Sequence, residues 1–68
     1  MRGNMREARR RKGFSIGDVS KAIGVHGNAI ERWERGEAEP MGSNLIALSK
    51  LYGCSPDWLM EQDDKRDL

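Results

Sequence analysis

The segment SIGDVSKAIGVHGNAIERWERG, residues 15–36, contains the strongest structural signals of this chain. It contains two apolar patterns with the spacing of a helix, one around Val19 and the other around Trp33. Gly24 lies between them, and a glycine can adopt the positive φ with which many helices end. The stretch therefore predicts two helices joined by a turn of about three or four residues.

The inner faces of these two helices have the residues that close packing at such a turn requires. Ser20 is small enough to lie where the helices touch, and Gly24 suits the turn itself. The apolar residues expected to fill the space inside are Val19, Ile23, Val25, Ile30 and Trp33. Because one stretch meets all of these demands, we predict a helix-turn-helix over residues 16–35.

The sequence on the N-terminal side of this motif predicts a further short helix. Met5 and Ala8 have the spacing of its buried face, and Gly13 supplies a residue that can end it. Ser15 then precedes Asp18 by three residues, close to the pattern of a capping box. The second helix is therefore expected to begin directly after Ser15.

Two more helices are expected on the C-terminal side. Residues 36–43 contain proline and glycine and are interpreted as a loop, after which Ser43 or Asn44 is expected to open a helix that ends at Gly53. The segment SPDWL, residues 55–59, begins with a serine cap and has proline at the first helical position. It predicts a fifth helix.

The length and composition limit the class of protein. No segment alternates polar and apolar residues, so we expect an all-α domain over residues 1–60 and a charged C-terminal tail over residues 61–68. One cysteine and one histidine exclude an internal disulfide and a four-ligand zinc site, so no metal and no cofactor are expected. The chain also lacks a membrane span and an apolar signal region, which favours a cytoplasmic protein.

The charge is unevenly divided along the chain. Residues 1–35 have nine Lys and Arg and four Asp and Glu, a net +5, whereas residues 36–68 have three and seven, a net −4. The basic half can face a polyanion such as a nucleic acid. The overall pI of about 7.9 is nevertheless below the value of roughly 9 that is typical of DNA-binding domains. Charge alone therefore leaves open a solvated basic helix without a partner.

Three segments resemble the XRE/Cro–cI family, and especially the N-terminal DNA-binding domains of lambdoid phage repressors. They are VSKAIGV at residues 19–25, RWERG at 32–36 and SPDWL at 55–59, and the resemblance extends over about residues 3–60. It implies a five-helix, lambda-repressor-like fold. It also implies a double-stranded DNA operator as the partner, bound by a homodimer.

The resemblance makes the helix over about residues 27–35 the recognition helix, which lies in the major groove. Asn28 would pair with adenine through its amide, and Arg32 with guanine through its guanidinium. Glu31 would accept from cytosine, or would hold Arg32 or Arg35 in place. The same resemblance pairs Arg9 with Glu34, which would brace the first helix on the third.

The chain departs from the family pattern at three positions. Ile16 stands where the family often has glutamine, and Gly27 stands where a second glutamine is common. His26 replaces the usual serine or threonine cap of the recognition helix. We expect Ile16 to contact a thymine methyl group and Gly27 to let the backbone approach the DNA closely.

Phosphate contacts are expected from helix N-termini and from basic side chains. The residues expected to make them are Ser15, His26, Arg10, Arg11, Arg35, Ser43 and Asn44, with Arg6 as a further partner. A single helix-turn-helix reads few bases, so a homodimer on DNA is expected. Its surface is expected to include the loop 37–44 and the fifth helix around Trp58 and Met60.

Several functions remain compatible with the sequence. The leading hypothesis is a transcriptional repressor, either free-standing and Cro-like or the DNA-binding part of a longer cI-type repressor. An antitoxin or a restriction-modification controller shares the fold, as would a protein-interaction module that has lost DNA binding. An enzyme is not expected, because the chain has a single histidine and no phosphate-binding loop or Ser/His/Asp set.

Overall fold

A computed structural model of the chain describes residues 1–62 and contains five helices within them. They are α1 (Gly3–Arg11), α2 (Ile16–Ile23), α3 (Gly27–Arg35), α4 (Gly42–Tyr52) and α5 (Pro56–Met60). No strand occurs in residues 1–62, so the prediction of an all-α, five-helix fold is confirmed. Of the expected charged tail, residues 63–68 lie outside the described residues.

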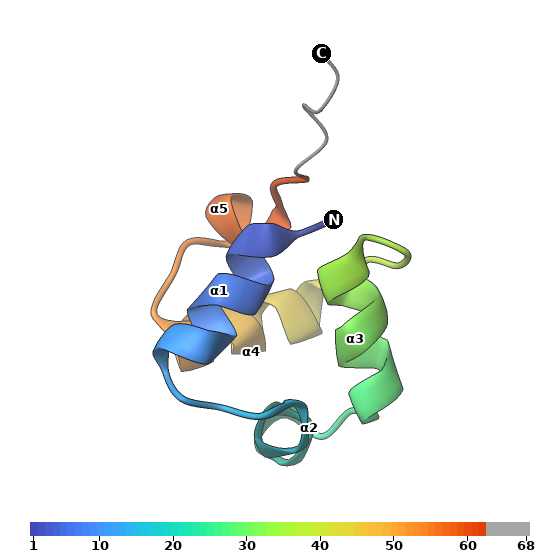
Figure 1. The fold of residues 1–68 in the computed structure, drawn as a ribbon, viewed down its shortest axis with the longest axis vertical. Helices are drawn as coiled ribbons and strands as arrows, with labels where there is room; N and C mark the ends of the chain where they lie inside the picture. Colours follow the sequence, from blue (N-terminus) through green and yellow to red (C-terminus); the bar gives the residue numbers. More distant parts are fainter. Residues whose placement is uncertain (63–68) are drawn as a thin grey trace.

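The five helices enclose one small core to which each of them contributes. Figure 1 shows α3 on one side, α2 across the bottom and α4 behind, while α1 packs against both α3 and α5. The buried apolar side chains are Met5, Ala8, Val19, Ile30, Trp33, Leu48, Tyr52 and Leu59. This shared core fixes α2 and α3 relative to the rest of the molecule. Among residues 1–62, no helix is long and apolar enough to cross a bilayer.

The predicted turn between α2 and α3 is present. Gly24 has φ of 72° and closes α2 in the left-handed conformation that suits glycine. The hydroxyl of Ser20 donates to the carbonyl of Val25, so this small residue ties the turn to α2. Val19 is fully buried beneath the turn. The local signals in the sequence were therefore sufficient to place the helix-turn-helix.

The capping box at the start of α2 is also present. The Asp18 N–H donates to the Ser15 hydroxyl at 3.0 Å, and the Ser15 N–H donates to the Asp18 carboxylate at 2.9 Å. Hydrogen bonds from the Ser15 backbone and side chain hold the pKa of Asp18 below its ordinary value. The box therefore fixes where α2 begins.

The start of α4 differs from the prediction. The helix begins at Gly42 rather than at Ser43 or Asn44, and Met41 occupies the capping position without a side-chain hydrogen bond. The N–H of Leu45 donates to the carbonyl of Met41 at 2.8 Å, which adds one residue at the N-terminal end. Ser43 and Asn44 therefore lie inside the first turn, because backbone hydrogen bonding, not a polar cap, starts this helix.

Candidate nucleic-acid interface

The first residues of α2 and α3 lie against each other. A Cβ atom added at Gly27 would lie 3.1 Å from Cγ2 of Ile16, closer than most carbon contacts. Both residues are half-buried, and Ile16 packs against the edge of the core. Two of the three departures from the family pattern, Ile16 and Gly27, are thus one local feature, because the isoleucine lies in space that a side chain at position 27 would need.

The three residues expected to read bases share one exposed face of α3. Asn28, Glu31 and Arg32 are all exposed. Positions three and four residues apart lie on the same side of a helix, so these side chains form a single row. The buried residues Ile30 and Trp33 occupy the opposite side. The structure therefore brings Asn28, Glu31 and Arg32 together on the solvent side of the helix.

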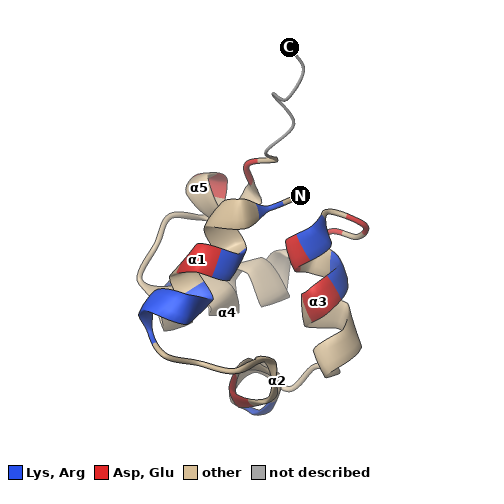
Figure 2. Cartoon of the chain, viewed as in Figure 1, with Lys and Arg blue, Asp and Glu red and all other residues tan. Residues whose placement is uncertain are grey.

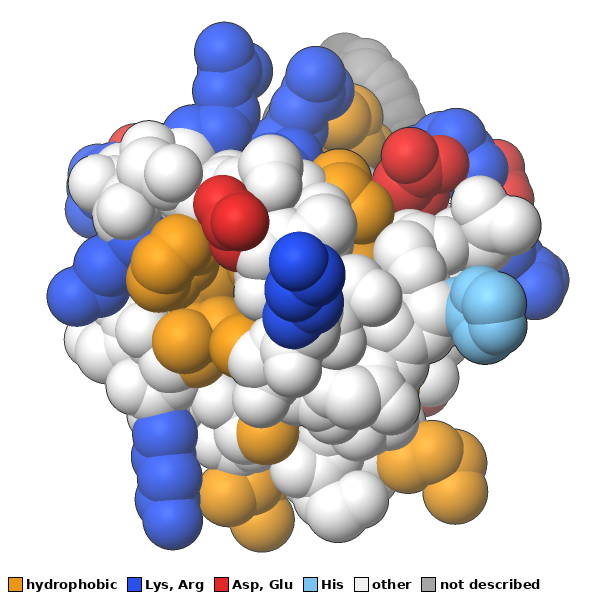
Figure 3. Space-filling view, turned by 90° about the horizontal axis from the view of Figure 1, so that it is seen from below, with side chains coloured by type: hydrophobic (Ala, Val, Ile, Leu, Met, Phe, Trp, Pro, Cys, Tyr) orange, Lys and Arg blue, Asp and Glu red, His pale blue; other side chains and the backbone are white. Residues whose placement is uncertain are grey.

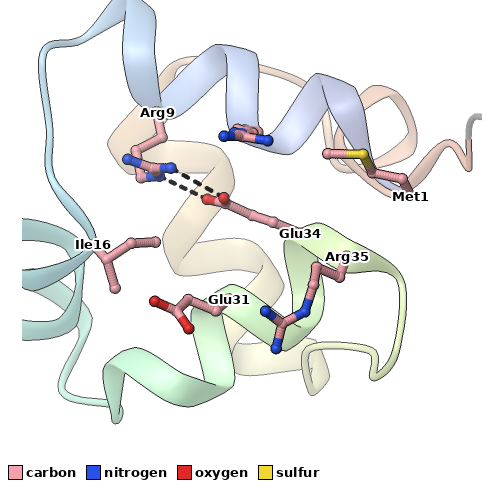
Figure 4. A pocket seen from close by; sticks show the side chains of 7 residues that line it. Met1, Arg9, Ile16, Glu31, Glu34 and Arg35 are labelled. Carbon is pink, nitrogen blue, oxygen red and sulfur yellow. Dashed lines mark hydrogen bonds and ion pairs between the residues drawn. The ribbon is translucent and has the colours of Figure 1, made fainter.

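An ion pair joins α1 to α3. Arg9 donates from Nε to Glu34 Oε2 at 2.7 Å and from Nη2 to Oε1 at 3.1 Å, which makes the pair bidentate (Figure 4). A third bond runs from Arg9 to the carbonyl of Phe14 at 3.1 Å. The hydrogen bond to Glu34 raises the pKa of Arg9. This pair fixes the tilt of α3 relative to α1.

A second arginine, whose role the sequence did not reveal, holds the C-terminal end of α3. Arg2 is 1% exposed, and its Nη1 atom donates to the carbonyls of Trp33 at 2.9 Å and Ala38 at 2.8 Å. Its backbone N–H also donates to the carbonyl of Glu34 at 2.8 Å. In the sequence Arg2 is one of several basic residues near the N-terminus, and nothing local marks it as buried.

The candidate phosphate contacts around α2 and α3 are exposed. Ser15 lies at the N-terminus of α2, although its hydroxyl already accepts a hydrogen bond in the capping box. His26 occupies the capping position of α3, and its side chain makes no capping hydrogen bond. Arg35, in the last turn of α3, pairs with Glu37 at 3.1 Å. A phosphate would compete with that carboxylate for Arg35.

The remaining candidates lie on α1 and α4. Arg10 and Arg11 are exposed at the end of α1, and Arg11 pairs with Glu7 at 2.5 Å. Ser43 is exposed and Asn44 half-buried in the first turn of α4, where backbone N–H groups have no partner within the helix. A phosphate would compete with Glu7 for Arg11, whereas Arg10 and Ser43 are exposed.

A shallow pocket lies between α1 and α3, with Ile16 at its edge (Figure 4). Its volume is about 270 Å³, and its lining residues are Met1, Arg6, Arg9, Ile16, Glu31, Glu34 and Arg35. Pockets for drug-sized ligands usually enclose roughly 300–1,000 Å³ and are mostly apolar. The charged lining and small size favour a surface groove beside α3 over a small-molecule site.

The basic residues gather at one end of α1, while the charges of α3 alternate in sign (Figure 2). Seen from the side of α2 and the start of α3, Lys and Arg side chains project around the face, and acidic side chains are few (Figure 3). Apolar patches lie between them. Such a surface combines groups that attract phosphates with groups that can contact bases.

Comparison with known proteins places this chain among helix-turn-helix proteins. It is 50% identical over 56 residues to repressor protein C2 of Salmonella phage P22, covering 79% of this chain and 26% of that protein. It is 42% identical over 48 residues to the regulator DicA of Escherichia coli K12, covering 71% and 36%. The chain thus spans about a quarter and about a third of the lengths of these two relatives.

The same relative appears among solved structures. The crystal structure of the P22 c2 repressor in complex with a synthetic operator has a TM-score of 0.81 and 43% identity, covering 90% of this chain and 92% of that one. The sequence profile described as Helix-turn-helix matches residues 5–59. These findings confirm the resemblance to phage repressors, and the chain belongs to the helix-turn-helix family.

Proposed function

We propose that this protein is a sequence-specific double-stranded DNA-binding transcriptional regulator, a repressor of the Cro or cI type. The observation that carries the proposal is the exposed row of Asn28, Glu31 and Arg32 on a helix held by Arg9 and Glu34. The 43% identity to the P22 c2 repressor, solved in complex with an operator, supports it. In this proposal the protein binds DNA, catalyses no reaction and acts in the cytoplasm.

In the proposed complex, α3 lies in the major groove with its N-terminal half towards the bases. Asn28 pairs with adenine, Arg32 pairs with guanine and Glu31 accepts from cytosine. Ile16 contacts a thymine methyl group, because Gly27 has no side chain that would cover it. The basic residues and helix N-termini named above hold phosphates and set the register without reading sequence.

The test begins with selection of binding sites from random-sequence DNA. The selected duplex and a scrambled duplex are then compared in competition gel shifts. Asn28→Ala and Arg32→Ala should each cost about 1–3 kcal/mol on the selected duplex and relax specificity at one base position. Lys50→Ala, an exposed change on α4, serves as the control and should leave the selectivity unchanged. If both variants on α3 keep full discrimination, the proposal is wrong.

The proposed complex contains a homodimer. The interface between its two chains includes the loop 37–44 and α5. Met41 in this loop is 72% exposed, and Trp58 and Met60 on α5 are half-buried. Apolar side chains at such positions can pack against a second copy. Sedimentation of the protein with its selected duplex should give two protein chains per duplex. One chain per duplex, or a stable tetramer without DNA, would contradict this arrangement.

Salt dependence separates this function from the alternatives. Binding through phosphates weakens steeply as salt concentration rises. A protein-interaction module that has lost DNA binding would show no salt-dependent binding even at low ionic strength. An antitoxin or a restriction-modification controller would bind DNA in the same way, and only a neighbouring toxin or methyltransferase gene would identify it.

A further inference from the structure

Two arginines of α3 share one carboxylate from the loop that follows it. Glu37 lies 3.1 Å from Nε of Arg35 and 3.9 Å from Nε of Arg32, measured to its two carboxylate oxygens. Both ion pairs thus use Nε. The two terminal nitrogens of a guanidinium form the fork that can pair bidentately with guanine O6 and N7. For Arg32 the nitrogen nearest to Glu37 is Nε, so the fork is not the part of the guanidinium closest to this carboxylate.

The backbone that carries Glu37 is held in place. The N–H of Glu37 donates to the carbonyl of Arg32 at 2.9 Å, and Gly36 closes α3 with φ of 81°. The next residue, Ala38, accepts from the buried Arg2 at 2.8 Å. The carboxylate therefore extends from a fixed point rather than from a free loop.

Glu37 has little to contribute to the stability of the fold. Its side chain is 53% exposed, and its two arginine partners are 57% and 55% exposed. Ion pairs of this exposure change an equilibrium constant by roughly fivefold or less. A carboxylate beside the C-terminal end of a helix is also opposed by the helix dipole. Its main physical effect is on the orientation and availability of Arg32 and Arg35.

On the basis of the proposed function, we propose that Glu37 is a positioning residue that determines specificity. It steers Arg32 so that its fork faces the base edges, and this contact persists when the fork binds guanine. On DNA that lacks guanine at the position read by Arg32, the Glu37 carboxylate draws Arg32 and Arg35 away from phosphates. It also repels the phosphate backbone of the DNA. Glu37 thus raises the ratio of operator to non-operator affinity.

The test compares Glu37→Gln with Glu39→Gln. Both variants remove one negative charge from the same loop, but Glu39 pairs with Arg2, at 3.6 Å, instead of the arginines of α3. Gel shifts measure affinity for the selected duplex and for a scrambled duplex. Glu37→Gln should bind the scrambled duplex about fivefold more tightly and steepen its log–log salt dependence by about one unit. Glu37 and Glu39 both lie in the loop proposed for the dimer interface, so Glu39→Gln also controls for an effect on dimerisation. Such an effect would change both affinities together, and Glu39→Gln should therefore leave their ratio unchanged.

A double-mutant cycle shows whether Glu37 acts through Arg32. In the Arg32→Ala background, Glu37→Gln should no longer alter discrimination at the guanine position. Thermal unfolding should show that both loop variants fold like the wild-type protein. Equal effects of Glu37→Gln and Glu39→Gln on the ratio, or additive effects with Arg32→Ala, would overturn the inference and leave the proposed function intact. A wild-type protein that does not prefer the selected duplex would overturn both.

Discussion

The two ends of α3 are held very differently. At the C-terminal end, Trp33 and Glu34 are each 5% exposed, and Arg2 and Arg9 reach this end from α1 and the residues before it. At the N-terminal end, His26 caps the helix without a side-chain hydrogen bond, and Asn28 is exposed. The C-terminal end is thus fixed by buried polar contacts, whereas the N-terminal end packs against Ile16 through Gly27 and exposes its polar side chains.

The difference in burial indicates that the two ends of α3 have different roles. Buried hydrogen bonds at the C-terminal end fix the direction of the helix axis, because they link α3 to other parts of the fold. The N-terminal end has free backbone N–H groups and the positive end of the helix dipole, which favour contact with an anionic partner. The C-terminal end (the held end) positions the helix, and the N-terminal end (the open end) remains available for the proposed contact with DNA.

The largest expected effect is at the held end. Glu34→Ala should lower the free energy of unfolding by about 3 kcal/mol, because it leaves the largely buried Arg9 guanidinium without its carboxylate. The measurement is urea unfolding followed by circular dichroism. Glu31→Ala, one turn earlier on the exposed face, is the matched control and should change stability little. Similar losses in both variants would remove the distinction between the two faces of α3.

A smaller effect, of opposite sign, is expected at the open end. His26→Ser should raise the free energy of unfolding by about 1 kcal/mol, because a serine hydroxyl can accept from the first free N–H groups of α3. The backbone of His26, with φ of −66° and ψ of 143°, already has the extended conformation of a capping residue. Thermal unfolding measures the change. Ser15→Ala should cost a similar amount at α2, and no gain from His26→Ser would mean that the open end is stabilised in another way.

The smallest effect is expected beside the held end, at Tyr52. Its buried hydroxyl has no hydrogen-bond partner among residues 1–62, so Tyr52→Phe should leave stability at neutral pH within about 0.5 kcal/mol of wild type or slightly above it. Burial, with the nearby charge of Glu34, raises the pKa of Tyr52 to about 12.

The sign of the pH dependence follows from this pKa. An unfolded tyrosine has a pKa of about 10, so the folded state favours the protonated form. The stability that this provides is complete below pH 10 and is lost as the pH rises towards 12. Tyr52→Phe should lose less stability than wild type over that interval in urea unfolding. Parallel pH curves for the two proteins would contradict the buried state of the hydroxyl.

Much of the scaffold could be predicted because its signals are local. The Ser15 and Asp18 capping box, the turn at Gly24 and the apolar spacing around Val19 and Trp33 each depend on residues close together in the chain. The Arg9 and Glu34 pair was expected only through the family resemblance. The start of α4 was misplaced by one or two residues, because helix ends set by backbone bonds have weak sequence signals.

Local sequence patterns specify the five helices, the helix-turn-helix and the row of polar residues on α3, because helical periodicity and capping act over a few residues. Which arginines are buried depends instead on how distant segments of the chain pack together. No local sequence signal marks Arg2 as buried, yet Arg2 lies inside the fold and Arg10 lies in solvent. The packing of the folded chain also places Glu37 beside Arg32, and Ile16 beside Gly27. Such contacts depend on how chain segments turn back on each other, which no local pattern records.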